Sequence, residues 1–537
     1  MIQYDGWALL KSAAKKSIIL VLDRFIRLKL YNYGESRMKK RITALILAAL
    51  MLVPALASCS ESEVNEEQPQ ETSAPETAAV PAEVTEETEA PSEYELRQQI
   101  PDNLPETNFD GAEFRIMTDP AEDYISEIIS EELNGDACND AVYNRNVKVE
   151  DRFGVTIKAV EQVDPNYVVG TFVKAGTDDA HIAGFKDYLA YTAFMDGSLM
   201  NWMETPYQDL SQPWHNKLAN EGATLNNILY AICSDLSITS MTYTYAIFAN
   251  VDMLADYGYD KEYMYDLVRE GTWTLDKLIE MTDGMYVDRN GNGEREVSDI
   301  YGYGYYINNP TDVWFTAFGE KVCEFRDNEI VLTYMSDKTV SIYEKLYDWH
   351  YNHAGFCIYP NMYDEEQYFL DERLVMSSMR FAAAYTTLRD MDSTYTILPI
   401  PKWDEEQEVY CTNADDKFTV FGLPLTSEPN LDFVSIIFEA LCAESYKQVY
   451  PAYYDQALKG KYSSDATAAE MVDLIMEGRA FEFTFQFGGD GAFKGLCYLI
   501  RFTLIEQSTA FASKYKSMEK AIKMNIPRLL GKAYKFN

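Results

Sequence analysis

Residues 144–157 read NRNVKVEDRFGVTI, and this stretch decides the expected fold. The pattern predicts a helix over residues 140–152, which Gly154 ends, and a strand over residues 155–157. Residues 114–118, with the sequence FRIMT, precede the helix and also favour a strand. Two strands with one helix between them imply a parallel, right-handed α/β unit.

The same alternation continues along the chain. Strands are expected at residues 229–232, 245–248, 394–400 and 417–423, and helices at residues 272–281, 434–442 and 466–476. We find no repeat at a solenoid period, and 537 residues exceed one ordinary domain. The sequence therefore predicts an α/β protein of two or more lobes.

The charge distribution limits the ligands that this chain can take. Its formal net charge is −40, of which −35 falls on the region from Arg97 onward. The basic stripe that neutralises phosphates is absent, which argues against nucleic acid as a partner. Long-range repulsion also disfavours anionic ligands, although a local arginine can override it. Neutral oligosaccharides fit this balance best, and the 40 tyrosines supply rings with polar tips that suit such ligands.

The first hundred residues contain an export signal. Residues 38–41 (MKKR) are basic, residues 42–56 are almost wholly apolar, and Leu56-Ala57-Ser58-Cys59 resembles a bacterial lipobox. We expect a signal peptide at 38–58, a lipid on Cys59, and a position on the outer face of the cell membrane. Residues 1–37 are interpreted as a non-native upstream extension. Residues 59–108 are rich in Glu, Thr, Pro and Ser, which predicts a disordered acidic tether.

Five stretches of the sequence together resemble the extracellular solute-binding proteins of family 1, the sugar-binding lipoproteins of ABC importers in Gram-positive bacteria. In chain order they are residues 144–157 (NRNVKVEDRFGVTI), 207–216 (YQDLSQPWHN), 245–257 (YAIFANVDMLADY), 271–281 (GTWTLDKLIEM) and 395–403 (YTILPIPKW). The order of the stretches carries the resemblance more than any single one of them does.

The resemblance implies a two-lobed α/β fold of the periplasmic-binding-protein type (type II), with hinge crossovers and a ligand cleft between the lobes. It implies a first lobe at 109–244, a second at 245–403, a return to the first at 404–445, and a C-terminal helical part at 446–537 that belongs mainly to the second. The implied partners are a carbohydrate and the permease subunits of an ABC importer, and the implied state is a monomer.

Sugar sites combine aromatic platforms with carboxylate, amide or guanidinium groups that bind ring hydroxyls. Residues of these types near expected strand ends are the ligand-binding candidates: Asp235, Tyr305, Tyr306, Trp314, Arg380 and Tyr385. The alternative for each is structural, because a tyrosine or tryptophan can fill the core and an aspartate can cap a helix.

Residues 288–299 read DRNGNGEREVSD, which matches the spacing of a calcium-binding loop. The predicted ligands of a structural Ca²⁺ are Asp288, Asn290, Asn292, Glu294 and Asp299. The alternative is an Asn/Gly-rich surface turn. His350 and His353 lie three residues apart on an expected helix, but no third metal ligand is evident and packing is favoured.

No nucleophile-elbow, P-loop or zinc-protease motif is present in the sequence. We therefore predict a binding protein rather than an enzyme, which captures a carbohydrate for an ABC importer. Two alternatives stay open: a secreted glycan-active enzyme, which should hold a buried carboxylate with a raised pKa, and a surface glycan-binding protein without a role in transport.

Overall fold

The computed structural model describes residues 93–326, 329–458, 466–488 and 491–535. The chain divides into two units, 1–88 and 89–537, and every described residue belongs to the second. The predicted signal peptide and Cys59 lie outside the described residues. Within the described ranges, none of the helices is both long and apolar enough to cross a bilayer.

The first lobe is built on a five-stranded sheet with the order β2-β1-β3-β13-β4. Its strands are β1 (Ala112–Thr118), β2 (Val155–Glu161), β3 (Ile182–Lys186), β4 (Ala231–Ile232) and β13 (Thr419–Gly422). β1 pairs in parallel with β2, as the sequence predicts, and also in parallel with β3, a strand that the sequence analysis did not predict. β13 returns from far along the chain and runs antiparallel to β3 and β4. Its helices are α3 (Glu122–Ile128), α4 (Ala137–Phe153), α5 (Val169–Ala175), α6 (Asp187–Met195), α7 (Lys217–Ala223) and α16 (Leu431–Glu444).

Helix α4 shows why the sequence fixes this unit. Asp136 caps its start by accepting hydrogen bonds from the Cys138 and Asn139 N–H groups. Gly154 ends it with φ of 60°, a left-handed conformation that glycine adopts at little cost. Val142, Val149 and Phe153 on one face of the helix are buried.

The second lobe contains a sheet with the order β10-β7-β11-β5-β12, and β6 pairs with β7. The strands are β5 (Tyr245–Asn250), β6 (Tyr286–Val287), β7 (Ile300–Tyr305), β10 (Phe356–Ile358), β11 (Leu374–Arg380) and β12 (Tyr395–Leu398). β7, β10 and β11 are parallel, and β5 is antiparallel to β11 and β12. Its helices are α9 (Val251–Asp256), α10 (Lys261–Arg269), α11 (Leu275–Asp283), α12 (Asn309–Ala317), α13 (Asp337–Asn352), α14 (Asp364–Leu370), α15 (Ala382–Tyr385) and α17 (Ala466–Glu477). β8 (Cys323–Arg326) and β9 (Glu329–Leu332) pair with each other in a separate antiparallel sheet.

Three chain segments join the lobes. One leaves α8 (Thr239–Thr242) and enters β5, the second runs from residue 411 to β13, and the third runs from α17 to η8 (Phe483–Phe487), a 3₁₀ turn that packs on α6 and α7. Isolated bridges tie the segments together, pairing Thr244 with Ala414 and Thr412 with Arg479. We call these segments the crossovers.

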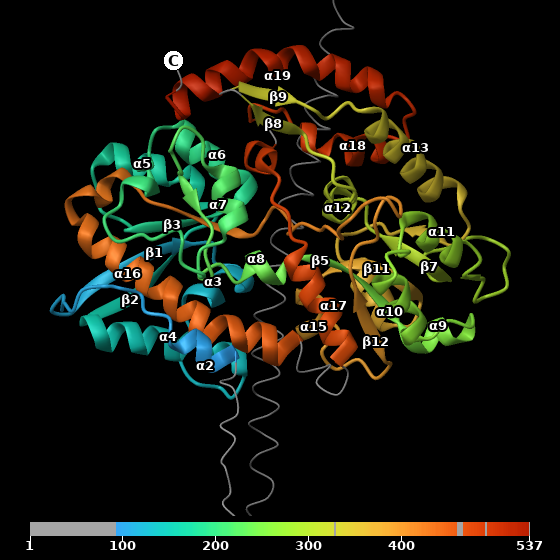
Figure 1. The fold of residues 1–537 in the computed structure, drawn as a ribbon, viewed down its shortest axis with the longest axis horizontal. Helices are drawn as coiled ribbons and strands as arrows, with labels where there is room; N and C mark the ends of the chain where they lie inside the picture. Colours follow the sequence, from blue (N-terminus) through green and yellow to red (C-terminus); the bar gives the residue numbers. More distant parts are fainter. Residues whose placement is uncertain (1–92, 327–328, 459–465, 489–490, 536–537) are drawn as a thin grey trace, which may run out of the picture. The chain divides into compact units, whose positions relative to one another are not determined.

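The C-terminal helices contact both lobes. α18 (Leu499–Ile505) packs on α12 of the second lobe, while α19 (Phe511–Ala533) contacts α6 of the first and α13 of the second (Figure 1). The two-lobed α/β fold predicted from the sequence is therefore confirmed.

One expectation about the tether is wrong. The sequence predicted disorder through residue 108, but residues 93–108 belong to the fold: α2 (Glu93–Gln98) is helical and Leu104 is buried. Asp102 pairs with Arg152 of α4 at 2.5 Å, and the Arg97 guanidinium lies 4.7 Å from the Tyr450 ring centroid. These few contacts anchor a polar segment whose composition alone argues for disorder.

Candidate functional site: the carboxyl edges of the two sheets

The parallel strands of both sheets end near the crossovers. In open α/β sheets, ligands bind outside the carboxyl ends of the strands. In this protein those ends are Thr118, Glu161 and Lys186 in the first lobe, and Tyr305, Ile358 and Arg380 in the second. The side chains at and just beyond these positions form the candidate site.

A continuous stack of side chains connects the two edges. The Lys186 Nζ lies 5.2 Å from the Tyr124 ring centroid, and the Tyr124 and Tyr243 rings meet edge to face at 6.3 Å. The Arg380 guanidinium then lies between two rings, 4.1 Å from the Tyr243 centroid and 4.5 Å from the Tyr363 centroid. We call these five residues the cation–tyrosine ladder, and it runs from the first lobe through a crossover to the second.

Arg380 is the most informative member of the ladder. It is only 8% exposed, yet its guanidinium donates no hydrogen bond to any side chain or backbone group that the structure describes, and its Nε is buried without a partner. A guanidinium has five N–H donors along its edge, and leaving such a group buried and unsatisfied is costly. The two tyrosine rings cover its faces, so its edge is left for an acceptor.

Asn166 presents a second unsatisfied group at the same edge. It is 3% exposed in the turn after β2, and neither its Nδ2 nor its Oδ1 has a partner in the described part of the chain. It lines a small cavity of about 10 Å³ together with Asp119, Asp164 and Lys186. The Lys186 Nζ donates to Asp119 Oδ2 at 2.9 Å and to Asp164 Oδ1 at 3.2 Å, so its charge is balanced locally.

Two buried carboxyls of α14 lie on the second-lobe side of the ladder. Burial raises the pKa of Glu365 to about 8, and the neighbouring charge of Glu366 adds to this. Burial also raises the pKa of Glu366, whose Oε2 accepts a hydrogen bond from Thr387 Oγ1 at 2.6 Å. Glu365 Oε2 accepts from the Tyr306 N–H at 3.4 Å. A protonated carboxyl can both donate and accept a hydrogen bond.

Both lobes contact the crossovers at this site. Tyr243 donates its hydroxyl proton to Asp123 Oδ2 of the first lobe at 2.5 Å, and Tyr124 OH donates to the crossover carbonyl of Lys417 at 3.0 Å. Next to this contact, Asn309 Nδ2 donates to Asp415 Oδ1 at 2.6 Å, which holds the crossover against α12.

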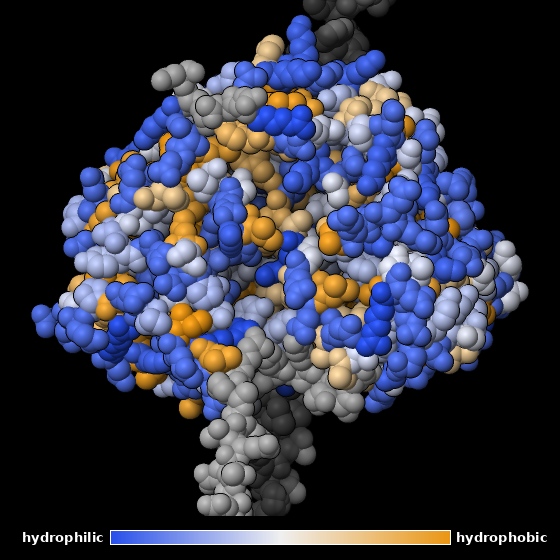
Figure 2. Space-filling view, in the orientation of Figure 1, coloured by the Kyte–Doolittle hydropathy of each residue, from blue (hydrophilic) through white to orange (hydrophobic). Residues whose placement is uncertain are grey.

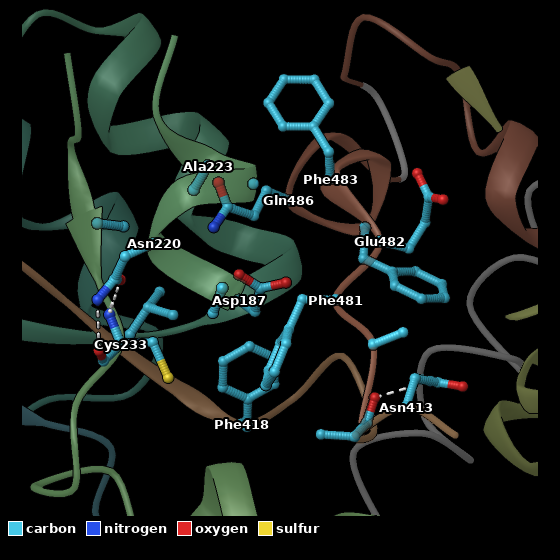
Figure 3. Close-up of a pocket in the computed structure, with 17 residues that line it drawn as sticks. Asp187, Asn220, Ala223, Cys233, Asn413, Phe418, Phe481, Glu482, Phe483 and Gln486 are labelled. Atoms are coloured by element: carbon cyan, nitrogen blue, oxygen red, sulfur yellow. Dashed lines mark hydrogen bonds between the residues drawn. The ribbon is translucent and has the colours of Figure 1, made fainter. Parts of the chain in front are cut away.

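On the side of α7, the lobes leave a larger space between them. A cavity of about 510 Å³ is lined by residues of α7, of β8 and β9, and of two crossovers. An adjoining pocket of about 30 Å³ is lined by Asp187, Asn413 and Phe418 among others (Figure 3). Figure 2 shows a recess below α19 on this face.

The structure divides the predicted ligand contacts into two groups. Arg380 and Tyr306 lie at the carboxyl edges, where the sequence placed them. Tyr305 and Trp314 are fully buried in the second lobe, where Trp314 Nε1 donates to Tyr305 OH at 2.9 Å and His350 Nε2 lies 2.7 Å from that hydroxyl. Both have a packing role, and neither lines the cavities described above.

The other two candidates have different surroundings. Asp235 follows β4, and burial raises the pKa of its carboxyl to about 7, while the nearby charge of Arg479 opposes that shift. The Tyr385 ring packs against Tyr453 at 5.7 Å. Neither belongs to the ladder, and as ligand contacts both stay predictions.

The predicted calcium loop, residues 288–299, contains hydrogen bonds between its own residues. Asp288 accepts hydrogen bonds from the Gly291 and Gly293 N–H groups, both at 2.7 Å, and Asn292 Oδ1 accepts from the Glu294 N–H. Across the described residues, no group of three or more His, Cys, Asp or Glu side chains is arranged to hold a metal ion. Two of the predicted ligands, Asn290 and Asn292, are amides and do not belong to those four residue types, so calcium binding stays a prediction.

Sequence reasoning missed four members of the ladder. Lys186 could have been found, because it ends a strand whose carboxyl edge faces the site. Tyr124, Tyr243 and Tyr363 could not, since nothing in the sequence distinguishes them among the 40 tyrosines before the chain folds.

No protein-family model matches this sequence, and no curated protein matches it either. Among solved structures, maltose-bound MalE3 of T. maritima is similar with a TM-score of 0.47 and 13% identity, over 78% of this chain and 99% of that chain. We therefore infer the fold and the site from the strand order and the side chains of this protein itself.

Proposed function

We propose that this protein is a lipid-anchored extracellular solute-binding protein, which captures a carbohydrate between its lobes and delivers it to an ABC importer. The observation that carries the proposal is Arg380: a buried guanidinium at the carboxyl edge, held between two tyrosine rings, whose Nε has no hydrogen-bond partner among the described residues. The lipobox at Cys59 and the order of the family-like stretches support export and transport.

The chemistry of the site favours a neutral sugar over other solutes. Sugar hydroxyls both donate and accept, and the site offers donors from Arg380 and acceptors from carboxyls such as Glu365. Asn166 supplies one of each. Tyrosine faces give flat platforms for sugar rings. Because the lysine and acids at the edge balance one another, no strong excess of positive charge selects an anion.

The first experiment is a thermal-shift screen of the full chain against neutral oligosaccharides. We expect one sugar to raise the melting midpoint, because binding to the folded state alone stabilises it. The same sugar is then titrated into an Arg380→Met variant, where the loss of charge-assisted hydrogen bonds should weaken binding by about tenfold to a hundredfold.

Arg528→Met is the matched control, because Arg528 is exposed on α19 and away from the ladder. Its affinity for the sugar should equal that of the wild type. If the Arg380→Met variant binds the sugar as tightly as the wild type does, the ladder is not part of the sugar-binding site. If no sugar in the screen raises the melting midpoint, carbohydrate is not the ligand class of this protein.

One observation favours the second candidate, a glycan-active enzyme. Such an enzyme needs a carboxyl that stays protonated near neutral pH, and Glu365 has a pKa of about 8 at the site. The two functions differ in turnover. Chromatography of the sugar after incubation with the protein would show breakdown products for an enzyme and unchanged sugar for a transport protein.

A further inference from the structure

Residues 511–535 carry a charge opposite to that of the rest of the chain. They contain seven Lys or Arg residues and one acid, Glu519, which gives a net charge of +6, whereas the whole region from Arg97 onward has −35. Most of this segment forms α19. The net charge of the chain conceals it, so the expectation that the sequence holds no basic stripe is wrong here.

The structure places the lysines of this segment on one side of α19. Tyr515, Ile522 and Ile526 are buried against the protein. On the opposite side, four lysines of the helix and one just after it are exposed: Lys516, Lys520, Lys523, Lys532 and Lys535. We call these five residues the lysine face. The 23 residues of α19 give it a length of about 35 Å, and Figure 1 shows it along the upper edge of the described residues.

Few of these charges are neutralised within the protein. Lys523 Nζ lies 2.6 Å from Glu519 Oε1, and the other four lysines form no ion pair with any residue that the structure describes. Lys516 and Lys520 are one helical turn apart, where like charges repel each other. An external anion bound along the helix would relieve this repulsion.

The outer side of α19 also carries an exposed apolar side chain. Met524 is 68% exposed, the highest value among the large hydrophobic residues described, and it follows Lys523 directly. Figure 2 shows mainly hydrophilic residues along the same edge. Lysines and an exposed apolar side chain on one side of a helix are typical of elements that lie on a membrane surface. Nucleic-acid surfaces instead favour arginine forks and stacking rings, and no aromatic residue of α19 is exposed.

From this arrangement we propose that the lysine face binds the anionic headgroups of a lipid bilayer, with α19 parallel to the membrane surface. Each lysine close to such a surface adds an attraction that falls off within a Debye length. The same surface repels the acidic remainder of the protein, so contact through α19 favours one orientation. The choice of a bilayer rests on the proposed position at the membrane, but the binding itself needs neither Cys59 nor a sugar.

The test is co-sedimentation of residues 89–537 with lipid vesicles. This segment lacks the apolar residues 42–56 and Cys59, and it is one compact unit that contains every described helix and strand. It should bind vesicles of phosphatidylcholine and phosphatidylglycerol, mixed about two to one, at least about tenfold more tightly than phosphatidylcholine alone. Raising NaCl from about 50 mM to about 500 mM should release it, because salt screens exposed charges. Equal binding to both vesicles, or no binding to the anionic ones at low salt, would overturn the proposal.

A triple variant locates the contact on the helix. Lys516→Gln, Lys520→Gln and Lys532→Gln together remove three exposed charges without an internal partner, so the far-UV circular dichroism should stay that of the wild type. Binding to the anionic vesicles should weaken by at least about tenfold. Wild-type binding by this variant would exclude the lysine face.

The matched control removes three exposed charges outside α19 by Lys158→Gln, Arg289→Gln and Arg389→Gln. It changes the net charge equally and should bind the anionic vesicles almost as the wild type does. If it binds as weakly as the first variant, net charge rather than α19 governs the binding and the proposal is wrong. A short DNA duplex that binds more tightly than the anionic vesicles at the same salt would replace the bilayer by nucleic acid as the partner. Sugar affinity should be the same in both variants and the wild type, so a failure of the bilayer contact is distinguishable from a failure of the proposed function.

Discussion

Replacing Glu127 with glutamine should change how the stability of the fold depends on pH. Glu127 is 2% exposed in α3, and its Oε1 accepts from the Thr239 N–H at 2.9 Å where the first crossover begins. Its Oε2 has no partner among the described residues. Burial raises the pKa of this carboxyl to about 8 from the usual 4.5. Between these pH values the native state holds a proton that the unfolded chain has lost.

The sign and size of the effect follow from this difference. Because the native state binds the extra proton, the free energy of unfolding falls as the pH rises from 4.5 to about 8. The contribution is fully present below the unfolded pKa and lost above the folded one. One pKa unit corresponds to about 1.4 kcal/mol, so the loss between about pH 5 and about pH 7 is about 3 kcal/mol.

Glutamine resembles the protonated acid and does not titrate, so Glu127→Gln should escape this loss. Urea unfolding of wild type and variant, followed by far-UV circular dichroism, gives the difference in free energy of unfolding at each pH. This difference should shift in favour of the variant by about 3 kcal/mol between about pH 5 and about pH 7. The control is Glu131→Gln, at an exposed position four residues further on, which should show no such change. A pH-independent difference for Glu127→Gln would refute the reasoning.

Three further outcomes are expected. If residues 288–299 bind calcium, adding Ca²⁺ after EGTA should raise the melting midpoint of the wild type but not that of Asp288→Asn, and an unchanged wild-type midpoint would contradict calcium binding. Gly154→Ala should lower the free energy of unfolding, measured by urea denaturation, by more than about 1 kcal/mol. The reason is that φ is 60° at this position and that an added Cβ would lie 2.5 Å from the Asn108 side chain. The control is Gly284→Ala, which should be tolerated because Gly284 is exposed, has φ of −85° and has nothing within 4 Å of an added Cβ. Cys59→Ala should move the protein from the membrane fraction to the medium of the expressing bacterium, and retention of the variant in the membrane would argue against lipidation.

The sequence was sufficient for the fold because its signals there are local. Asp136 and Gly154 mark the two ends of α4, and the strand residues on either side alternate or cluster as buried strands do. The segment at 93–108 escaped prediction for the opposite reason. Its order depends on contacts such as Asp102 with Arg152, which lie 50 residues apart.

The site was less predictable because residue type does not reveal surroundings. Tyr305 and Tyr306 are neighbours in the sequence with the same side chain, yet the first is buried in the core beside Trp314 and the second is half-buried at a strand end. Alternation along β7 sends them to different environments. The position of Arg380 was predictable, but only the folded structure shows that Tyr243 and Tyr363 cover its guanidinium and that its Nε has no partner in the part of the chain described.

Lys186 and Asp187 show the same effect at the end of β3. They are consecutive, yet Lys186 lines the carboxyl-edge cavity with Asn166 whereas Asp187 lines the α7-side pocket with Asn413. Successive side chains of an extended chain point to opposite sides, so the sequence position of these two charged residues does not reveal which space each of them faces until the strands are in place.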